Sequence, residues 1–205
     1  LLTGVVTTRA LRTIPEQLII ERQTEVAQVA AAGVAATLRG QVRLLETIAV
    51  ELGENAGSPA RQQEILDNWD DALTTFGAGV CLLDAQFVAI AATGAATGSA
   101  HVSLADQDYV REVQATKAPV FSRYIRDRAT ERPIIAIAVP VLSKEGAMKS
   151  GGSFAGAIIG KLALDRPEWA RDLNLLRSPE GGRAYLIDDA CDVVYHPDSA
   201  RVGSS

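Results

Sequence analysis

Positively charged side chains near apolar segments are the groups of this chain best suited to chemistry. Five arginines gather within one short stretch, namely Arg111, Arg123, Arg126, Arg128 and Arg132. A guanidinium presents a planar fork of N–H donors that matches a carboxylate. Charged side chains beside hairpin turns usually face solvent, but one or two pointing inward would supply that fork. The stretch therefore indicates a region in which a small carboxylate can be held.

Two glycine-containing motifs imitate nucleotide-binding loops without meeting their requirements. Gly77-Ala78-Gly79 precedes a predicted strand and has no third glycine, whereas the dinucleotide fingerprint follows a strand and opens a helix. The segment 156–161 is one residue short of a phosphate-binding loop, and Leu162 stands where that loop needs Ser or Thr. Neither motif indicates a bound nucleotide.

The sequence also lacks the residue patterns of metal sites and of hydrolases. The two histidines, His101 and His196, lie far apart, and no carboxylate–histidine spacing surrounds either of them. No nucleophile-elbow motif frames a serine, so a hydrolase is the least favoured alternative. We expect no metal, no cofactor and no catalytic residue. A disulfide between Cys81 and Cys191 stays open, because the sequence does not show their geometry.

Length and composition describe a folded protein with an ordinary core. The chain has 205 residues, of which 47% are apolar and 22% charged. Its net charge of −5 argues against a nucleic-acid partner. The sequence contains no apolar run of about 18 residues, the length that a helix needs to span a bilayer. Because Leu1 is not an initiator methionine, we expect a soluble piece of a larger protein, with membrane helices in flanking segments absent from this chain.

A long N-terminal helix is predicted from Glu16 to about Leu52, with Pro15 at its first position. Apolar residues at a spacing of three to four form one stripe in its second half: Leu38, Val42, Leu45, Ile48, Ala49 and Leu52. Small residues dominate the first half, around Val29 and Gly33. They permit close approach of a second helix, which favours a homodimer. Packing of this half on the helix's own domain is an equal alternative.

The rest of the chain alternates between short helices and apolar strands. We predict helices near 65–73, at 106–115 with Ser103 as its cap, and at 167–176, and strands at 80–83, 87–91, 119–126, 132–142 and 154–164. This order predicts an α+β fold in which helices flank an antiparallel sheet of about five strands.

One pattern occurs twice and indicates two related modules. An apolar strand runs into Asp84, turns, and resumes as a second apolar strand; the same arrangement recurs around Asp188. Each copy is a predicted β-hairpin with an aspartate that can bond the local backbone. The second copy begins only shortly before the last residue, so it predicts the start of a second module.

The order and spacing of these segments resemble the extracytoplasmic Cache sensor domains, PAS-like modules of bacterial sensor histidine kinases, chemoreceptors and diguanylate cyclases. Four stretches carry the resemblance: 79–84 with Val88, 106–110, the strand pair from Phe121-Ser122 to Val141, and 156–164. The stretch 182–203 resembles the start of the membrane-proximal module of double Cache proteins. We therefore expect a helix at 1–55, a membrane-distal ligand-binding domain at 56–170, and a connector with the beginning of a second module at 171–205.

The resemblance implies a pocket between the sheet and the helix around Tyr109 for a small organic ligand. Family members usually place an arginine where Gln107 stands, and amino-acid-binding members carry an aspartate for the ligand amine where Lys161 stands. A lysine would repel an amine, so we expect an anionic ligand, favouring a carboxylate. Strand alternation places Ser122 and Tyr124 on one face and Arg123 on the other. The candidate ligand-binding residues are Tyr109, Ser122, Arg123, Tyr124 and Lys161.

The resemblance implies a non-catalytic sensing domain in the periplasmic or cell-surface part of a bacterial inner-membrane protein. We expect a signal-transduction protein, with a sensor histidine kinase favoured among the possible outputs and a signal carried through the long helix. The alternative is a dimerisation or spacer domain without a working pocket, motivated by Gln107 and Lys161.

Overall fold

The computed structural model describes residues 3–99, 101–143, 152–165, 185–187, 193–196 and 198–203. The connector helix predicted at 167–176, the turn of the second hairpin and Cys191 lie outside the described residues. Within the described part, no helix has the length and apolar character needed to cross a membrane.

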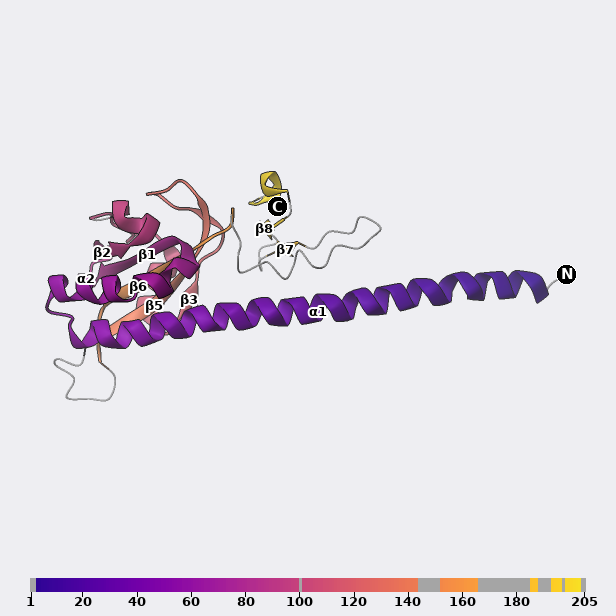
Figure 1. Ribbon diagram of the computed structural model, residues 1–205, viewed down its shortest axis with the longest axis horizontal. Coiled ribbons are helices and arrows are strands. Elements are labelled where there is room, and N and C mark those ends of the chain that lie inside the picture. Colours follow the sequence, from indigo (N-terminus) through magenta and orange to yellow (C-terminus); the bar gives the residue numbers. More distant parts are fainter. Residues whose placement is uncertain are drawn as a thin grey trace.

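A single helix, α1 (Thr3–Glu54), extends far beyond the sheet (Figure 1). Its 52 residues span about 78 Å at 1.5 Å per residue. The predicted start at Glu16 is wrong, because the backbone is helical on both sides of Pro15. An interior proline removes one backbone hydrogen bond, and the many intact bonds of the surrounding turns keep the helix continuous. The predicted end is close to the observed one.

The central sheet is antiparallel and has the strand order β2-β1-β6-β5-β3, with β4 also paired to β5. Its strands are β1 (Gly77–Asp84), β2 (Ala89–Thr93), β3 (Val120–Phe121), β4 (Ile125–Arg126), β5 (Pro133–Ser143) and β6 (Ser153–Ala163). Three helices accompany it: α2 (Pro59–Asn68), α3 (Asp70–Leu73) and α4 (Asp108–Thr116). Short 3₁₀ turns lie at Thr74–Phe76, Gly94–Ser99 and Ser199–Arg201. The predicted α+β fold with an antiparallel sheet is confirmed.

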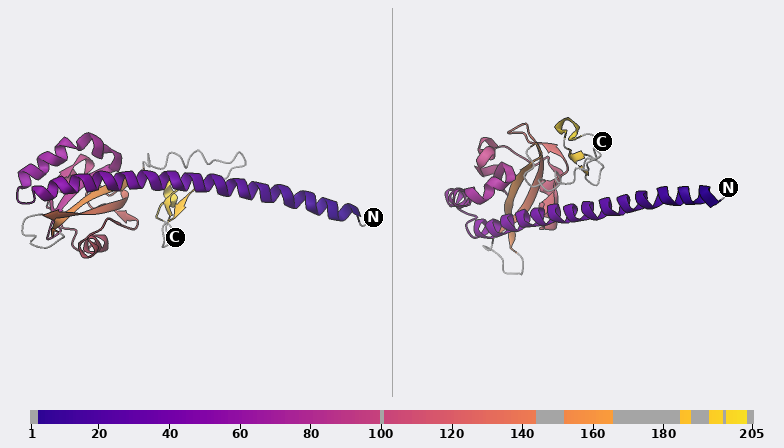
Figure 2. Two further views of the ribbon diagram at one scale, coloured as in Figure 1. Left: turned by 90° about the horizontal axis from the view of Figure 1, so that it is seen from below. Right: turned by 45° about the vertical axis from the view of Figure 1, so that its right-hand side comes forward.

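The two faces of the sheet are covered by different helices (Figure 2). The second half of α1 packs on one face and buries Leu45, Ile48 and Leu52 completely, as the predicted stripe requires. On the other face, α4 packs Val110 and Val113 against the strands. Successive residues of β6 point to opposite faces.

Gly160 in β6 permits a close approach on the α1 face. A Cβ there would lie 2.3 Å from the ring of Phe76, and β6 pairs with β1 on one side and β5 on the other. The glycine that resembled part of a phosphate-binding loop therefore makes room for an aromatic ring of the core.

Both predicted hairpins are present in the described residues. In the first, Asp84 Oδ1 accepts the backbone N–H groups of Gln86 and Val88, each at 2.9 Å, so the aspartate shapes the turn as predicted. In the second, β7 (Leu186–Ile187) pairs with β8 (Val193–Tyr195). Tyr195 of this hairpin packs on Ala30 and Val34 of α1. The C-terminal hairpin therefore lies against the long helix (Figure 1).

Two local predictions around α4 and β3 are corrected. The helix starts at Asp108, and Gln107 precedes it without a side-chain capping bond, so Ser103 is not its cap. Ser103 instead forms a β-bridge with Val88. The strand predicted at 119–126 is split into β3 and β4, because the Ser122 hydroxyl accepts the N–H of Ala136 on β5 and interrupts the regular pairing.

Candidate functional site

A buried ion pair lies on the α4 face of the sheet. Lys161 of β6 is only 3% exposed, and its Nζ lies 2.7 Å from Oδ1 of Asp127. The strand pairing places Lys161 opposite Ala136, and the neighbouring strand contributes Cys81 to the same face. A charge surrounded by apolar residues needs a counter-charge, since burying it unpaired is very costly. Asp127 supplies that charge.

Asp127 belongs to a tight turn between β4 and β5, which we call the Asp127 turn (residues 127–131). Its Oδ2 accepts the backbone N–H of Thr130 at 3.0 Å and the Thr130 hydroxyl at 2.8 Å. The backbone N–H of Glu131 donates to the Asp127 carbonyl at 2.8 Å. Burial acts to raise the pKa of Asp127, but the Lys161 ammonium and the Thr130 donors hold it below its ordinary value. The carboxylate is therefore ionised and uses both oxygens.

A small cavity lies directly beside the ion pair. Its volume is about 10 Å³, and its walls come from β1, β2, β6, the segment before α4 and the Asp127 turn: Cys81, Ala89, Val102, Leu104, Asp127, Arg128, Ala129 and Lys161. A cavity of this size has room for about one water molecule. Both charges of the pair line it, so a polar group entering the cavity would meet them.

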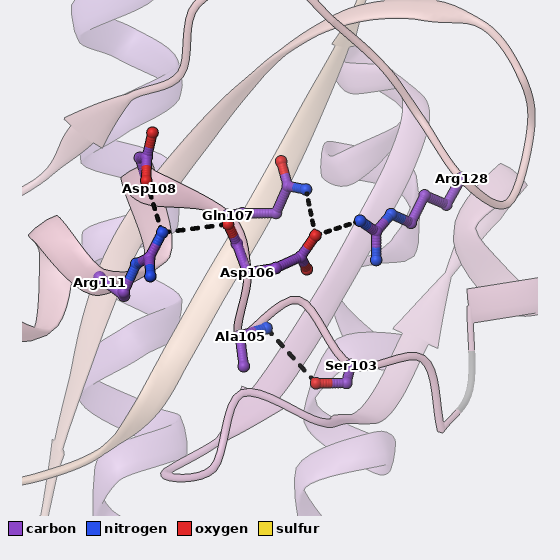
Figure 3. Close-up of polar contacts among 7 residues, drawn as sticks. All are labelled: Ser103, Ala105, Asp106, Gln107, Asp108, Arg111 and Arg128. Carbon is purple, nitrogen blue, oxygen red and sulfur yellow. Dashed lines mark hydrogen bonds and ion pairs between the residues drawn. The ribbon is translucent and has the colours of Figure 1, made fainter.

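The rim of the cavity carries a second, exposed ion pair (Figure 3). Arg128 of the Asp127 turn reaches Asp106, which lies just before α4. The Gln107 amide also donates to Asp106, at 3.4 Å. Hydrogen bonding to Arg128 lowers the pKa of Asp106. Arg111 binds Asp108 at 2.6 Å and so belongs to the outside of α4. The rim pair therefore bridges the two loop segments that line the cavity.

Two further ionisable groups on this face are neutral. Tyr109 of α4 is buried in the apolar cluster with Val110 and Cys81, and burial raises the pKa of its phenol. Burial also raises the pKa of the Cys81 thiol to about 11, although the nearby Lys161 ammonium acts in the opposite direction. Cys81 is a free thiol. The Lys161–Asp127 pair is thus set among neutral groups.

Comparisons with known proteins address the fold of the chain. No family model matches the sequence, and no curated protein matches it. Solved structures do match. The ligand-binding domain of the chemoreceptor CtaA of Pseudomonas fluorescens, in complex with L-serine, has a TM-score of 0.67 at 23% identity; the match covers 87% of this chain and 72% of that one. The chain has the fold of chemoreceptor ligand-binding domains.

Two further structures show the same chemoreceptor fold. The ligand-binding domain of PctC, an amino-acid chemoreceptor of Pseudomonas aeruginosa PAO1, is in complex with GABA; it has a TM-score of 0.64 at 19% identity, covering 88% of this chain and 77% of that one. An extracellular ligand-binding receptor from Desulfohalobium retbaense DSM5692 has a TM-score of 0.69 at 14% identity. The match covers 88% of this chain and 32% of that one. The fold expected from the Cache resemblance is therefore confirmed.

Within this chemoreceptor fold, the five predicted site residues separate into two groups. Lys161 lines the cavity and Tyr109 is buried on the same face of the sheet. The Ser122 hydroxyl donates to the carbonyl of Arg123 at 2.7 Å and accepts from β5, and the Arg123 side chain is exposed. The Tyr124 ring lies against Gly203 of the C-terminal turn. The structure thus brings Lys161 and Tyr109 to the α4 face and places Arg123 and Tyr124 outside the cavity wall.

The arginines of the sequence cluster have distinct positions. Arg128 lines the cavity at its rim, where its side chain is bound to Asp106. Arg132 binds Asp165 through two hydrogen bonds of 3.0 and 2.6 Å and donates to the Gly77 carbonyl at 2.8 Å. Arg126 donates to the Glu131 carbonyl at 3.3 Å. Arg132 and Arg126 thus fix the two ends of the Asp127 turn.

Asp127 is the site residue that sequence reasoning missed. It stands between Arg126 and Arg128, in a polar turn that resembles solvent-exposed surface. The available signal was Lys161 itself, because a lysine within an apolar strand requires a carboxylate partner.

Proposed function

We propose that this chain is the non-catalytic, extracytoplasmic sensing domain of a transmembrane signal-transduction protein, and that it binds a small organic anion on the α4 face of its sheet. The observation that supports the proposal most strongly is the buried Lys161 ammonium beside a cavity, in the fold of chemoreceptor ligand-binding domains. Solved domains of this fold hold L-serine and GABA.

The charge of Lys161 sets the class of ligand. An ammonium offers three N–H donors and no acceptor, so it holds a carboxylate and repels a ligand amine. In the Cache resemblance this position belongs to an aspartate that holds the amine of an amino acid. Reversing the charge favours a carboxylate without an ammonium group. Tyr109 lies on the same face and would contribute apolar contact, while Ser122, Arg123 and Tyr124 stay proposed contacts with less support from their positions.

The long helix is the proposed route of the signal. A ligand shifts a conformational equilibrium only by its difference in affinity for the two states. α1 covers the opposite face of the same sheet, so a change in β6 and β5 reaches it directly. The full-length protein would carry the output. The sequence favours a histidine kinase, whereas CtaA and PctC are chemoreceptors.

A homodimer through α1 is part of this proposal. Val29 in the first half of α1 is 74% exposed and lies among small residues. A groove of about 420 Å³ between α1 and β3, lined in part by Leu38, Val42 and Phe121, lies on another face of the helix nearer the sheet. Replacing Val29 with Glu should convert a dimer into a monomer in analytical ultracentrifugation. A wild-type monomer would contradict this part of the proposal.

A thermal-shift screen tests the ligand class. The wild type, Lys161→Met and the control Lys117→Met are screened against small carboxylates, amino acids and neutral metabolites. Lys117 is an exposed lysine that follows α4, so its variant removes the same charge outside the site. Carboxylates should stabilise the wild type and Lys117→Met but not Lys161→Met. Equal shifts in all three proteins would contradict the role of Lys161.

The alternative is a dimerisation or spacer domain whose pocket no longer binds a ligand. The small cavity and the existing partner of Lys161 are the observations that favour it. It predicts no stabilisation by any compound of the screen.

A further inference from the structure

We propose that Asp127 is a built-in competitor for Lys161: a ligand carboxylate replaces the Asp127 carboxylate on the Lys161 ammonium and displaces the Asp127 turn. This inference rests on the proposed function and adds to it the step by which the site opens.

The volume of the cavity makes displacement necessary. About 10 Å³ holds one water molecule and no organic acid. The walls supplied by Cys81, Ala89 and Lys161 belong to paired strands of the central sheet. The Asp127 turn supplies the remaining wall together with the segment before α4. Space for a ligand therefore comes from the movement of a loop segment, and the Asp127 turn carries the competing charge.

Charge gives a second reason for displacement. The Asp127 oxygen lies 2.7 Å from the Lys161 Nζ, at the distance a ligand carboxylate would itself occupy. Two carboxylates against one buried ammonium would leave a net buried negative charge, which is very unfavourable. When a ligand carboxylate binds Lys161, Asp127 must leave for solvent.

The bonding of the Asp127 turn suits this movement. The two bonds from Thr130 to Asp127 and the bond from Glu131 to the Asp127 carbonyl lie within the turn, so they move with it. Pairing of β4 with β5 fixes one end, and Arg132 bound to Asp165 fixes the other. Two ion pairs hold the segment between these ends: Asp127 with Lys161 inside, and Arg128 with Asp106 at the rim.

The competition predicts which ligands enter. A neutral metabolite offers Lys161 no charge in exchange for Asp127 and cannot displace it. A carboxylate can. An amino acid could instead be inserted between the two charges, with its carboxylate on Lys161 and its ammonium on Asp127, and in that case Asp127 would assist binding. The sign of the effect of removing the Asp127 charge therefore distinguishes a competitor from a ligand-binding residue.

The test is calorimetric titration with acetate, pyruvate, succinate and alanine at constant ionic strength. The variants are Asp127→Asn, Lys161→Met and Thr130→Val, which loosens Asp127 but keeps its charge. Asp108→Asn is the matched control, because it makes the same change at an exposed carboxylate paired with Arg111. We expect Asp127→Asn to bind the organic acids at least fivefold more tightly than the wild type. Thr130→Val should shift affinity in the same direction by less, and Asp108→Asn should leave it unchanged.

The outcomes separate this inference from the proposed function. Binding by the wild type that depends on Lys161 but is unchanged or weakened in Asp127→Asn overturns the competitor and leaves the anion sensor standing. Binding detected in Asp127→Asn alone supports the competitor. If neither the wild type nor Asp127→Asn binds any organic acid, both proposals fail. Should Asp127→Asn not fold, unchanged affinity in Thr130→Val overturns the inference.

Discussion

The two faces of the central sheet are formed by the same strands but bury different kinds of side chain. On the α1 face, Leu45, Ile48 and Phe76 pack on β6, and the described residues bury no charge there. On the α4 face, the residue next to Gly160 in β6 is Lys161, which is buried with Asp127 beside a cavity. The difference supports our proposal that the first face supplies stability and the second holds the ligand.

Energetics support this division. A buried ion pair is weak evidence for stability, since apolar residues of similar volume are often equally or more stabilising at such positions. The apolar cluster of the α1 face follows that solution, with the uncharged Gln41 and Gln62 as its buried polar neighbours. A buried pair retained on the α4 face, at the edge of a cavity, is therefore better explained by binding than by folding.

Breaking the buried pair is expected to have the largest effect. Lys161→Met leaves Asp127 without its counter-charge and should lower the free energy of unfolding by about 3–5 kcal/mol. The double variant Lys161→Met, Asp127→Leu should recover most of that loss. Urea denaturation measures both. A single variant as stable as the wild type would show that Asp127 is already free to leave.

Creating a cavity on the apolar face should lower the free energy of unfolding slightly less and leave the affinity for organic acids unchanged. Leu45→Ala should lower the free energy of unfolding by about 2–5 kcal/mol, because Leu45 is completely buried against the sheet. Its affinity for organic acids, measured by calorimetry on the folded protein, should equal that of the wild type. A large change in affinity would contradict the separation of stability on the α1 face from binding on the α4 face.

The pH dependence of stability should report the pair as well. The pKa of Asp127 lies below its ordinary value, so its contribution is present above about pH 4 and is lost as the pH falls through the lower pKa of the folded state. The Asp127→Asn variant should therefore lose less stability than the wild type as the pH falls. Melting temperatures of both proteins between neutral and acidic pH give the comparison. Parallel curves would contradict ionisation of Asp127 within the pair.

The rim pair should have the smallest effect on stability and a clear effect on opening. Arg128 and Asp106 are about half exposed, so solvent screens their attraction and Asp106→Asn should change the free energy of unfolding less than any of the variants above. It should nevertheless speed the reaction of Cys81 with a thiol reagent, measured in a Cys191→Ser background. Cys81 is buried with a pKa of about 11, so its reaction is slow until the cavity opens. An unchanged rate would remove the rim pair from the mechanism.

The sequence predicts the elements of both faces better than their contacts across space. Periodicity shows the helix stripe around Leu45, and alternation shows the strands and the turn at Asp84. Lys161 could be identified as a candidate site residue through the Cache resemblance, because an aspartate usually stands at its position. Its partner could not, because Asp127 in a turn between two arginines has the local pattern of exposed surface.

Two further predictions depend on more than the adjacent residues. Regular strand alternation predicts that Tyr124 faces the pocket; in the structure Ser122 bonds to Arg123 and Ala136, the strand is interrupted, and the Tyr124 ring lies against Gly203. Proline favours the first position of a helix, which predicts a start at Pro15, but α1 continues through it. Neither the long-range bond nor the continuity of α1 is encoded in the adjacent residues.

The most direct test of the central claim is a crystal structure of the domain bound to the carboxylate that stabilises it most. We predict that the ligand carboxylate lies within hydrogen-bond distance of Lys161 Nζ, with Asp127 turned out to solvent and α1 still packed on the opposite face. A ligand bound elsewhere, with the Lys161–Asp127 pair intact, would contradict it.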